Sequence, residues 1–165
     1  MKINDDHMYH GAALTQIAEH PQFTAINAFK IAGVTSRSAF KINDDIGIYL
    51  KYATKPKPPF REYVFTFNSD HLAELAALRR LRSSVFLALV CVKARQICCL
   101  PHTDFEALVE ARKKAKGSPE EQYALLATVP VGKSFRVYVN APGKRKVMLG
   151  KEIIISRNAF PKDIF

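Results

Sequence analysis

Basic residues gather around an aromatic side chain near the C-terminal end of the sequence. Arg136 and Tyr138 occupy alternate positions of one predicted strand, and Lys144, Arg145 and Lys146 follow in the next turn. Because side chains two positions apart share one face of a strand, Arg136 and Tyr138 are predicted to lie together on the face away from the core. Cations neutralise phosphates and release counterions, and an aromatic ring can stack a base. The pattern therefore predicts contacts with the phosphate backbone of nucleic acid, either DNA or RNA.

The distribution of charge supports the same surface. The chain has 25 Lys and Arg against 15 Asp and Glu, a formal net charge of +10. Residues 111–157 hold eleven of the basic residues and three of the acidic ones, so this segment alone carries +8. A solvated hairpin whose lysines protect a sheet edge is the alternative interpretation. A surplus of this size favours a polyanionic partner, either nucleic acid or an acidic protein.

A second set of residues could support metal-dependent chemistry. Asp44 and Asp45 precede a predicted strand, Lys51 lies on that strand, and Glu62 opens the next one. A metal-dependent nuclease needs carboxylates that converge on a divalent ion such as Mg²⁺, with a lysine close to the phosphate or the water. In the alternative interpretation, both aspartates are hydrogen-bond acceptors of an Asn-Asp-Asp turn.

This order of residues resembles the restriction-endonuclease-like core, whose pattern is Pro-Asp followed by Asp/Glu-x-Lys. The sequence departs from that pattern, because no proline precedes Asp44 and Glu62-Tyr63-Val64 lacks the lysine. The resemblance implies a nuclease that uses Mg²⁺, with a degenerate site made of Asp44, Asp45, Lys51 and Glu62. Outside this alternative no cofactor is predicted, and whether the protein is an enzyme stays open.

The histidines are a third group that could do chemistry. His7, His10 and His20 lie near the N-terminus, whereas His71 and His102 lie where two helices are predicted to begin. A histidine can act as an acid or a base near neutral pH. Capping of a helix or exposure to water explains the same positions without catalysis.

The three cysteines are predicted to be reduced and buried. Cys91, Cys98 and Cys99 lie in apolar segments, and their odd number and spacing do not suggest a disulfide framework. Adjacent residues of a strand point to opposite faces, so Cys98 and Cys99 cannot serve one zinc ion together. No metal site is predicted from them.

The stretch 60–100 is predicted to be the scaffold that positions these residues. It contains a strand at 63–67, an amphipathic helix capped by Asn68 or Ser69 and ending near Arg82, and an apolar run at 85–92. Because that run is apolar on both faces, we expect a central strand covered on both sides. A returning strand at 96–100 leads to a further helix, with Thr103 and Glu106 forming a capping box.

The remaining segments complete the predicted sheet. Two N-terminal helices are expected within residues 8–31, the first ended by Pro21 and the second closed by Gly33. The strand at 46–53 is predicted to pair antiparallel with the strand at 62–67 across a proline-rich connection. Residues 123–156 are β-rich, and the apolar tail at 158–165 is expected to pack on the body or on a second subunit.

Together these elements predict one α+β domain over residues 1–165, with a mostly antiparallel sheet, N-terminal helices and two further helices packed on it. Its parts are a helical segment (1–36), a strand–helix core (37–116) and a basic β-rich segment (117–165). No apolar run reaches the roughly 20 residues that cross a bilayer, and the N-terminus lacks a signal sequence. We expect a small basic cytoplasmic protein that binds nucleic acid, without a membrane partner. A metal-dependent nuclease and a protein–protein module with an acidic partner are the alternatives, and the apolar tail could support a homo-oligomer.

Overall fold

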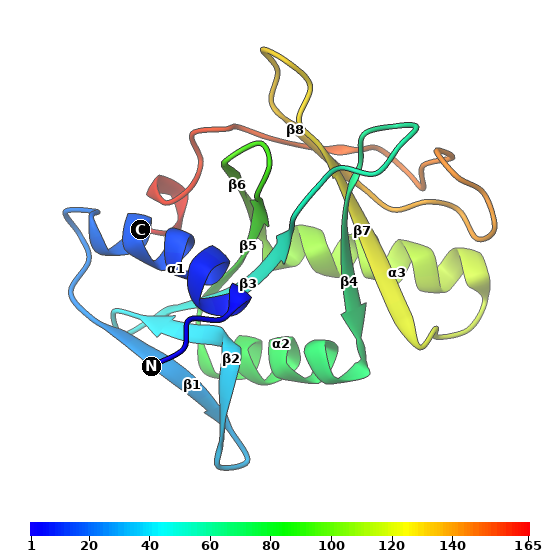
Figure 1. Ribbon diagram of the computed structural model, residues 1–165. Coiled ribbons are helices and arrows are strands. Elements are labelled where there is room, and N and C mark those ends of the chain that lie inside the picture. Colours follow the sequence, from blue (N-terminus) through cyan, green and yellow to red (C-terminus); the bar gives the residue numbers. More distant parts are fainter.

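The computed structural model describes all residues from 1 to 165 and contains two β-sheets and three α-helices (Figure 1). Its helices are α1 (Asp5–Ala18), α2 (Ser69–Leu81) and α3 (His102–Lys116), with a short 3-10 turn, η1 (Lys162–Ile164). Its strands are β1 (Ile26–Ile31), β2 (Val34–Ile42), β3 (Ile46–Ala53), β4 (Tyr63–Asn68), β5 (Ser84–Cys91), β6 (Gln96–Pro101), β7 (Gln122–Thr128), β8 (Phe135–Tyr138) and β9 (Ile153–Ile155). This composition confirms the predicted α+β class. No helix is both long and apolar enough to cross a membrane.

The first sheet has the strand order β1-β2-β3-β5-β6, and only its β3–β5 pair is parallel. The predicted central strand is confirmed, because β5 lies between β3 and β6 and is buried along most of its length. Helices cover both faces of the sheet. The ring of Tyr52 on β3 contacts Tyr9 of α1, whereas Gly47 on β3 faces Leu78 of α2. Positions 47 and 52 point to opposite faces of one strand.

The second sheet has the order β4-β7-β8-β9 and is antiparallel throughout. The predicted pairing of the strand at 46–53 with the strand at 62–67 is therefore wrong. The edge of β3 that β4 would need is taken by β5, in register from Ile46↔Ser84 to Ala53↔Cys91. After β3, the proline-rich connection leads to β4 in the second sheet. Helix α2 then returns the chain to the first sheet, where β5 runs parallel to β3.

The second predicted N-terminal helix is a strand instead. β1 pairs with β2 through a two-residue turn in which Ala32 and Gly33 both have positive φ angles, 49° and 79°. Two positive φ angles are the mark of a type I′ hairpin, so Gly33 serves a hairpin and does not close a helix. The amide side chain of Asn43 holds the start of this hairpin by accepting from the backbone N–H of Thr24 at 2.7 Å.

Helix capping follows the sequence at α2 but not at α3. Asn68 caps α2, and its side chain accepts from the backbone N–H of His71, whose Nδ1 accepts in turn from Asn68. The predicted capping box of Thr103 and Glu106 is wrong, because the N-cap is Pro101, two residues before Thr103, and it makes no side-chain bond. At the other end, Gly117 closes α3 in the left-handed region.

The core is one hydrophobic cluster of 39 buried residues, which includes the three cysteines. All three are free thiols, as predicted, and burial raises the pKa of Cys91 and Cys99 to about 12. They remain neutral at physiological pH and carry no reactive thiolate. The C-terminal tail also joins the core, since Phe160 and Ile164 are buried against their own chain. Those two side chains therefore offer no exposed apolar surface to a second subunit.

Candidate nucleic-acid interface

Tyr138 does not lie on the exposed face that the alternation of its strand predicts. Its side chain is fully buried, and its hydroxyl donates to the carboxylate of Glu62 and accepts from Lys146 Nζ at 2.9 Å. A buried ring cannot stack a base, so the predicted stacking role of Tyr138 is wrong. Its strand neighbour Arg136 is partly buried and lies 3.6 Å from Glu152. Neither side chain is therefore free on the surface to contact a nucleic acid.

An exposed aromatic ring lies close by on a different loop. Phe60 is 39% exposed, and its ring centre lies 5.8 Å from the Arg145 guanidinium and 5.7 Å from Lys146 Nζ. Arg145 also donates to the Pro58 carbonyl, which fastens the 141–151 loop to the 54–61 loop. The structure therefore brings an aromatic ring to the predicted cations, although from a segment more than eighty residues away in sequence.

Two further loops leave the sheets beside the 54–61 loop. The β5–β6 turn, residues 92–95, is bonded to the end of β3 through Val92 N–H to the Ala53 carbonyl at 3.0 Å. The β7–β8 turn, residues 130–134, starts where β7 pairs with the first residue of β4, in the register Tyr63↔Ala127. Figure 1 shows these loops along the upper edge of the molecule, with the 141–151 loop at the upper right. We call the four loops together the basic end.

The basic end accounts for the whole net charge of the protein. It carries ten cations and no Asp or Glu: Lys55, Lys57, Arg61, Lys93, Arg95, Lys133, Lys144, Arg145, Lys146 and Lys151. Subtracting these ten from the 25 basic residues of the chain leaves 15, which equals the 15 acidic residues outside the basic end. All ten are exposed except Lys146, which is partly buried. The surplus charge is therefore collected at one end of the fold and not spread over its surface.

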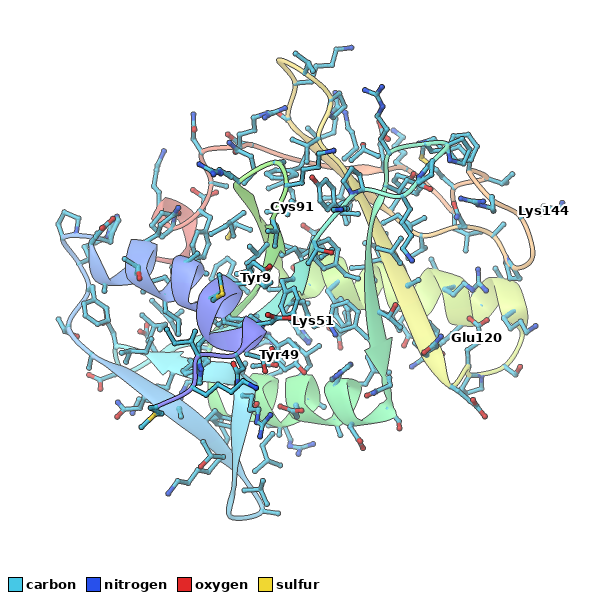
Figure 2. The ribbon with its side chains drawn as sticks, in the orientation of Figure 1. Tyr9, Tyr49, Lys51, Cys91, Glu120 and Lys144 are labelled. Atoms are coloured by element: carbon cyan, nitrogen blue, oxygen red, sulfur yellow. The ribbon has the colours of Figure 1, made fainter.

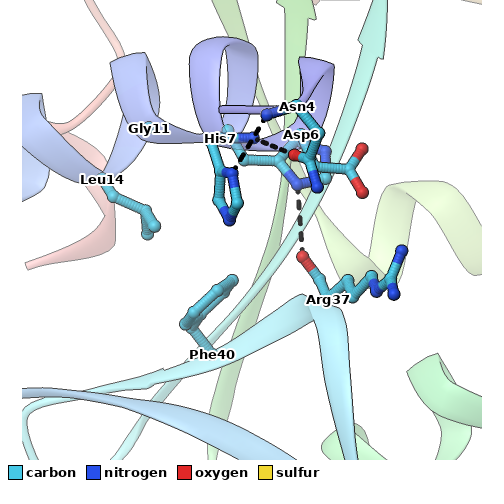
Figure 3. Close-up of a pocket in the computed structure, with 8 residues that line it drawn as sticks. Asn4, Asp6, His7, Gly11, Leu14, Arg37 and Phe40 are labelled. Carbon is cyan, nitrogen blue, oxygen red and sulfur yellow. Dashed lines mark hydrogen bonds between the residues drawn. The ribbon is translucent and has the colours of Figure 1, made fainter. Parts of the chain in front are cut away.

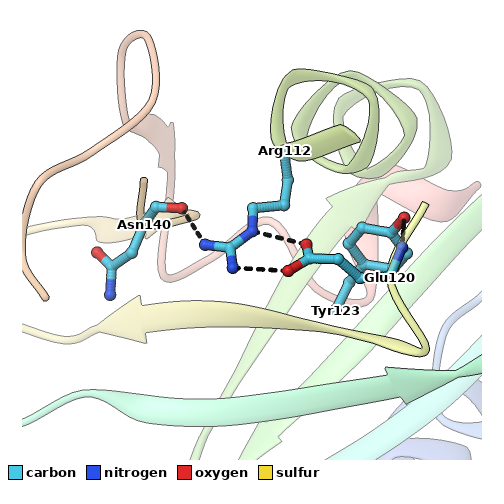
Figure 4. A network of polar contacts seen from close by, with 4 residues as sticks. All are labelled: Arg112, Glu120, Tyr123 and Asn140. Carbon is cyan, nitrogen blue, oxygen red and sulfur yellow. Dashed lines mark hydrogen bonds and ion pairs between the residues drawn. The ribbon is translucent and has the colours of Figure 1, made fainter. Parts of the chain in front are cut away.

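Several basic residues of the C-terminal third have internal roles instead. Arg112 donates twice to Glu120, at 2.7 and 2.8 Å, and once to the Asn140 carbonyl (Figure 4). This hydrogen bonding lowers the pKa of Glu120. Arg157 donates to the carbonyls of Lys133 and Pro130. The bidentate pair ties α3 to the start of β7, so Arg112 is committed to the fold and is not free to hold a phosphate.

The residues of the nuclease alternative do not converge. Asp44 and Asp45 are exposed in the turn before β3, and Lys51 lies six residues farther along that strand, about 20 Å at the usual rise. Glu62 is 3% exposed and is bonded to Tyr138 in the second sheet. No group of three or more His, Cys, Asp or Glu side chains is arranged to hold a metal ion. In this structure Asp44 and Asp45 belong to a turn, with Asn43 at a φ of 53°.

The histidines divide into caps and buried groups. His7 and His71 complete the capping boxes of α1 and α2, and His20 stacks on Phe165 with ring centres 4.3 Å apart. His10 and His102 are buried, with exposed fractions of 5% and 6%. Burial lowers the pKa of both rings, so each is neutral at pH 7.

Stability is expected to fall as the pH drops from 7 to 5, with His102 as one contributor. Burial holds the folded pKa of His102 below its unfolded value, and the pull of Glu106 in the other direction is smaller. The unfolded chain therefore binds the extra proton first, and stability is lost as the pH falls through the two pKa values. Urea unfolding of the wild type and of His102→Leu at pH 7.5 and 5.0 measures this. An equal change with pH in both proteins would contradict the assignment.

Comparisons of this chain with protein-family models, with curated proteins and with solved structures find no match.

Proposed function

We propose that the protein binds nucleic acid through phosphate-backbone contacts with the basic end. The observation that supports this is the collection of ten cations, without one carboxylate, on four neighbouring loops. Counterion release makes such a surface attractive to DNA and RNA whatever their sequence. Nothing in these loops assigns base reading, so the proposal concerns affinity for the backbone and not sequence specificity.

Phe60 favours a single strand over a duplex. Its ring is partly exposed beside Arg145 and Lys146 of the 141–151 loop, and stacking of an unpaired base on an aromatic ring contributes about 1–3 kcal/mol. Bases in a duplex are already stacked on one another and are not free for this contact. A single strand could therefore follow the cations while one of its bases covers Phe60.

Removal of three cations from the basic end is expected to weaken binding about tenfold or more at 0.1 M salt. The variant combines Lys57→Gln, Lys144→Gln and Arg145→Gln, which leaves the buried contact of Lys146 with Tyr138 intact. The slope of log K against log salt should fall by about one per lost phosphate contact. Fluorescence anisotropy with labelled single-stranded and duplex DNA and RNA, over a salt series, measures both quantities.

The matched control removes three exposed cations outside the basic end, through Lys2→Gln, Lys30→Gln and Arg80→Gln near the N-terminus, on β1 and on α2. Figure 1 shows these parts of the chain along the lower edge of the molecule, opposite the basic end. If affinity depends only on net charge, both triple variants will weaken binding equally, and the assignment to the basic end is wrong. Absence of any affinity at low salt would overturn the proposal itself. The same loops would then be candidates for an acidic protein partner.

A further inference from the structure

The first sheet opens on one side of β3 because β2 turns away from it. The two strands pair from Ile42↔Ile46 to Ala39↔Tyr49 and no farther. The earlier part of β2 pairs only with β1, as in Lys30↔Thr35, so Leu50 and the residues after it have a neighbour in β5 but none in β2. We call this opening the fork.

A pocket of about 450 Å³ occupies the fork, between the first turns of α1 and α2. Its polar lining comes from four elements and consists of Asp6, His10, Arg37, Ser38, Lys51 and His71. A second pocket of about 420 Å³ shares Asp6, His10 and Arg37 with it, and Figure 3 shows Asp6 and Arg37 extending to the same side. Figure 2 shows Lys51 and Tyr49 beside the beginning of α1, well separated from Lys144 in the basic end.

Both cations of this pocket lack a counterion. Neither Arg37 nor Lys51 lies within 4.0 Å of a carboxylate oxygen, and neither side chain donates a hydrogen bond within the protein. Arg37 is exposed, but Lys51 is partly buried, with its Nζ 5.3 Å from the centre of the Phe67 ring. Burial lowers the pKa of Lys51, against the opposing pull of Asp6 and Glu74. A cation withdrawn from water without a partner is costly, and a bound anion would offset that cost.

The neighbouring side chains add groups that can bond to the same anion. His10 Nδ1 lies 3.2 Å from the Arg37 carbonyl, and because a carbonyl only accepts, that nitrogen carries the proton. The other ring nitrogen of neutral His10 is then an acceptor. The Tyr49 hydroxyl is fully buried near Glu74 and Ser38 and does not line the pocket, so it is not one of these groups. Glu74 itself accepts from Ser36, so its carboxylate already has a partner.

We propose that the fork pocket binds a phosphate group, held between Arg37 and Lys51. With neutral histidines, the lining of the pocket carries two cations and one carboxylate, Asp6, and this excess of cations in the lining favours an anion there. Glu74, whose charge also acts on Lys51, lies outside that lining. Ser38 can donate to a phosphate oxygen, and His10 can accept from a protonated one. The pocket is larger than a phosphate group alone, and its volume lies in the range of small-molecule sites. A phosphomonoester is therefore the class of ligand that fits, with Asp6 at the rim to accept from a hydroxyl of its organic part.

This ligand chemistry has two sources, a phosphorylated small molecule and the terminal phosphate of a nucleic acid strand. The proposal does not depend on nucleic-acid binding by the basic end, because none of the ten cations there lines the pocket. Its test must therefore examine phosphate binding separately from strand binding.

The first probe is inorganic phosphate, titrated into the full-length wild type at low ionic strength and followed by the NMR signals of His10 and of the Arg37 and Ser38 amides. We expect saturable binding, weakened about tenfold or more in Lys51→Gln, because the phosphate loses a hydrogen bond from a charged donor. Arg37→Gln should act in the same direction, and since Arg37 is exposed this variant is expected to keep the native fold. Lys30→Gln, an exposed lysine of β1 outside the pocket, is the matched control and should bind like the wild type.

Equal phosphate affinity in the wild type, Lys51→Gln and Arg37→Gln would overturn the proposal, as would the absence of saturable binding. The triple variant of the basic end should bind phosphate like the wild type, whether or not the basic end binds nucleic acid, because none of its three residues lines the pocket. Once binding is established, oligonucleotides with a 5′-phosphate and a 5′-hydroxyl identify the source. Tighter binding of the phosphorylated strand, lost in Lys51→Gln, would assign the site to a strand terminus, and equal binding would assign it to a small phosphomonoester.

Discussion

Replacement of Tyr138 by phenylalanine is expected to lower the free energy of unfolding by about 3 kcal/mol, because it removes the hydroxyl that donates to buried Glu62. Glu62 is 3% exposed, and its carboxylate has no other hydrogen-bond donor. The variant therefore leaves a carboxylate without a partner inside the second sheet. Urea unfolding followed by far-UV circular dichroism at pH 7 measures the loss.

The double variant Glu62→Leu, Tyr138→Phe separates this explanation from simple loss of packing. It removes both polar partners and is expected to recover most of the stability, since burying two apolar groups leaves nothing unsatisfied. If the double variant is as unstable as Tyr138→Phe alone, the unpaired carboxylate is not the cause. Lys146 would lose its 2.9 Å contact with the Tyr138 hydroxyl in both variants, so that contact does not confuse the comparison.

Leu78→Ala is expected to cost about 2–5 kcal/mol, the usual range for a buried leucine reduced to alanine. Leu78 is fully buried between α2 and β3, where a Cβ added at Gly47 would lie 2.9 Å from its Cγ. Gly47→Ala should therefore cost about 1–3 kcal/mol by overpacking. Thermal and urea unfolding of the two single variants measures both effects.

The combination of Gly47→Ala with Leu78→Ala gives a sharper test of this contact. The new methyl group at position 47 would occupy space that the shortened side chain vacates, so the two losses should not add. A double variant that loses the full sum of both single effects would mean that the two positions do not meet in the folded protein.

The sequence was informative where a segment decides its own conformation. The apolar run of β5 predicted a central strand, and Asn68 before an amphipathic segment predicted the start of α2. The sequence was not informative about which strand lies beside β3, because several apolar strands could fill that position equally well. The side chains at 46–53 and 62–67 fit an antiparallel pair, yet β3 and β4 lie in different sheets.

The residues of the candidate site were predicted only in part, because their exposure depends on loops that are distant in sequence. Alternation along β8 predicted an exposed Tyr138, but the 141–151 loop brings Lys146 over its hydroxyl and that face of the strand is covered. Counting charge along the sequence assigned the surplus to residues 111–157, where Arg112 and Arg157 are used internally. The loops at 54–61 and 92–95 supply five of the ten cations of the basic end. Their sequence positions do not show that they belong to the same surface as the 141–151 loop, because the contacts between these loops form only in the folded protein.

The parallel β3–β5 pair has a consequence for how the chain can be divided. The first sheet draws on residues 26–53 and 84–101, while the second takes 63–68 from between those segments and the rest from 122–155. A single cut at any peptide bond between residues 26 and 155 therefore leaves at least one sheet with strands on two fragments. Two of the seven strand pairings, β3–β5 and β4–β7, join segments distant in sequence, and such pairings slow folding. During synthesis β4 has no strand to pair with until β7 has been made. The proline-rich loop before β4, which carries three of the cations of the basic end, therefore takes its final position late in folding.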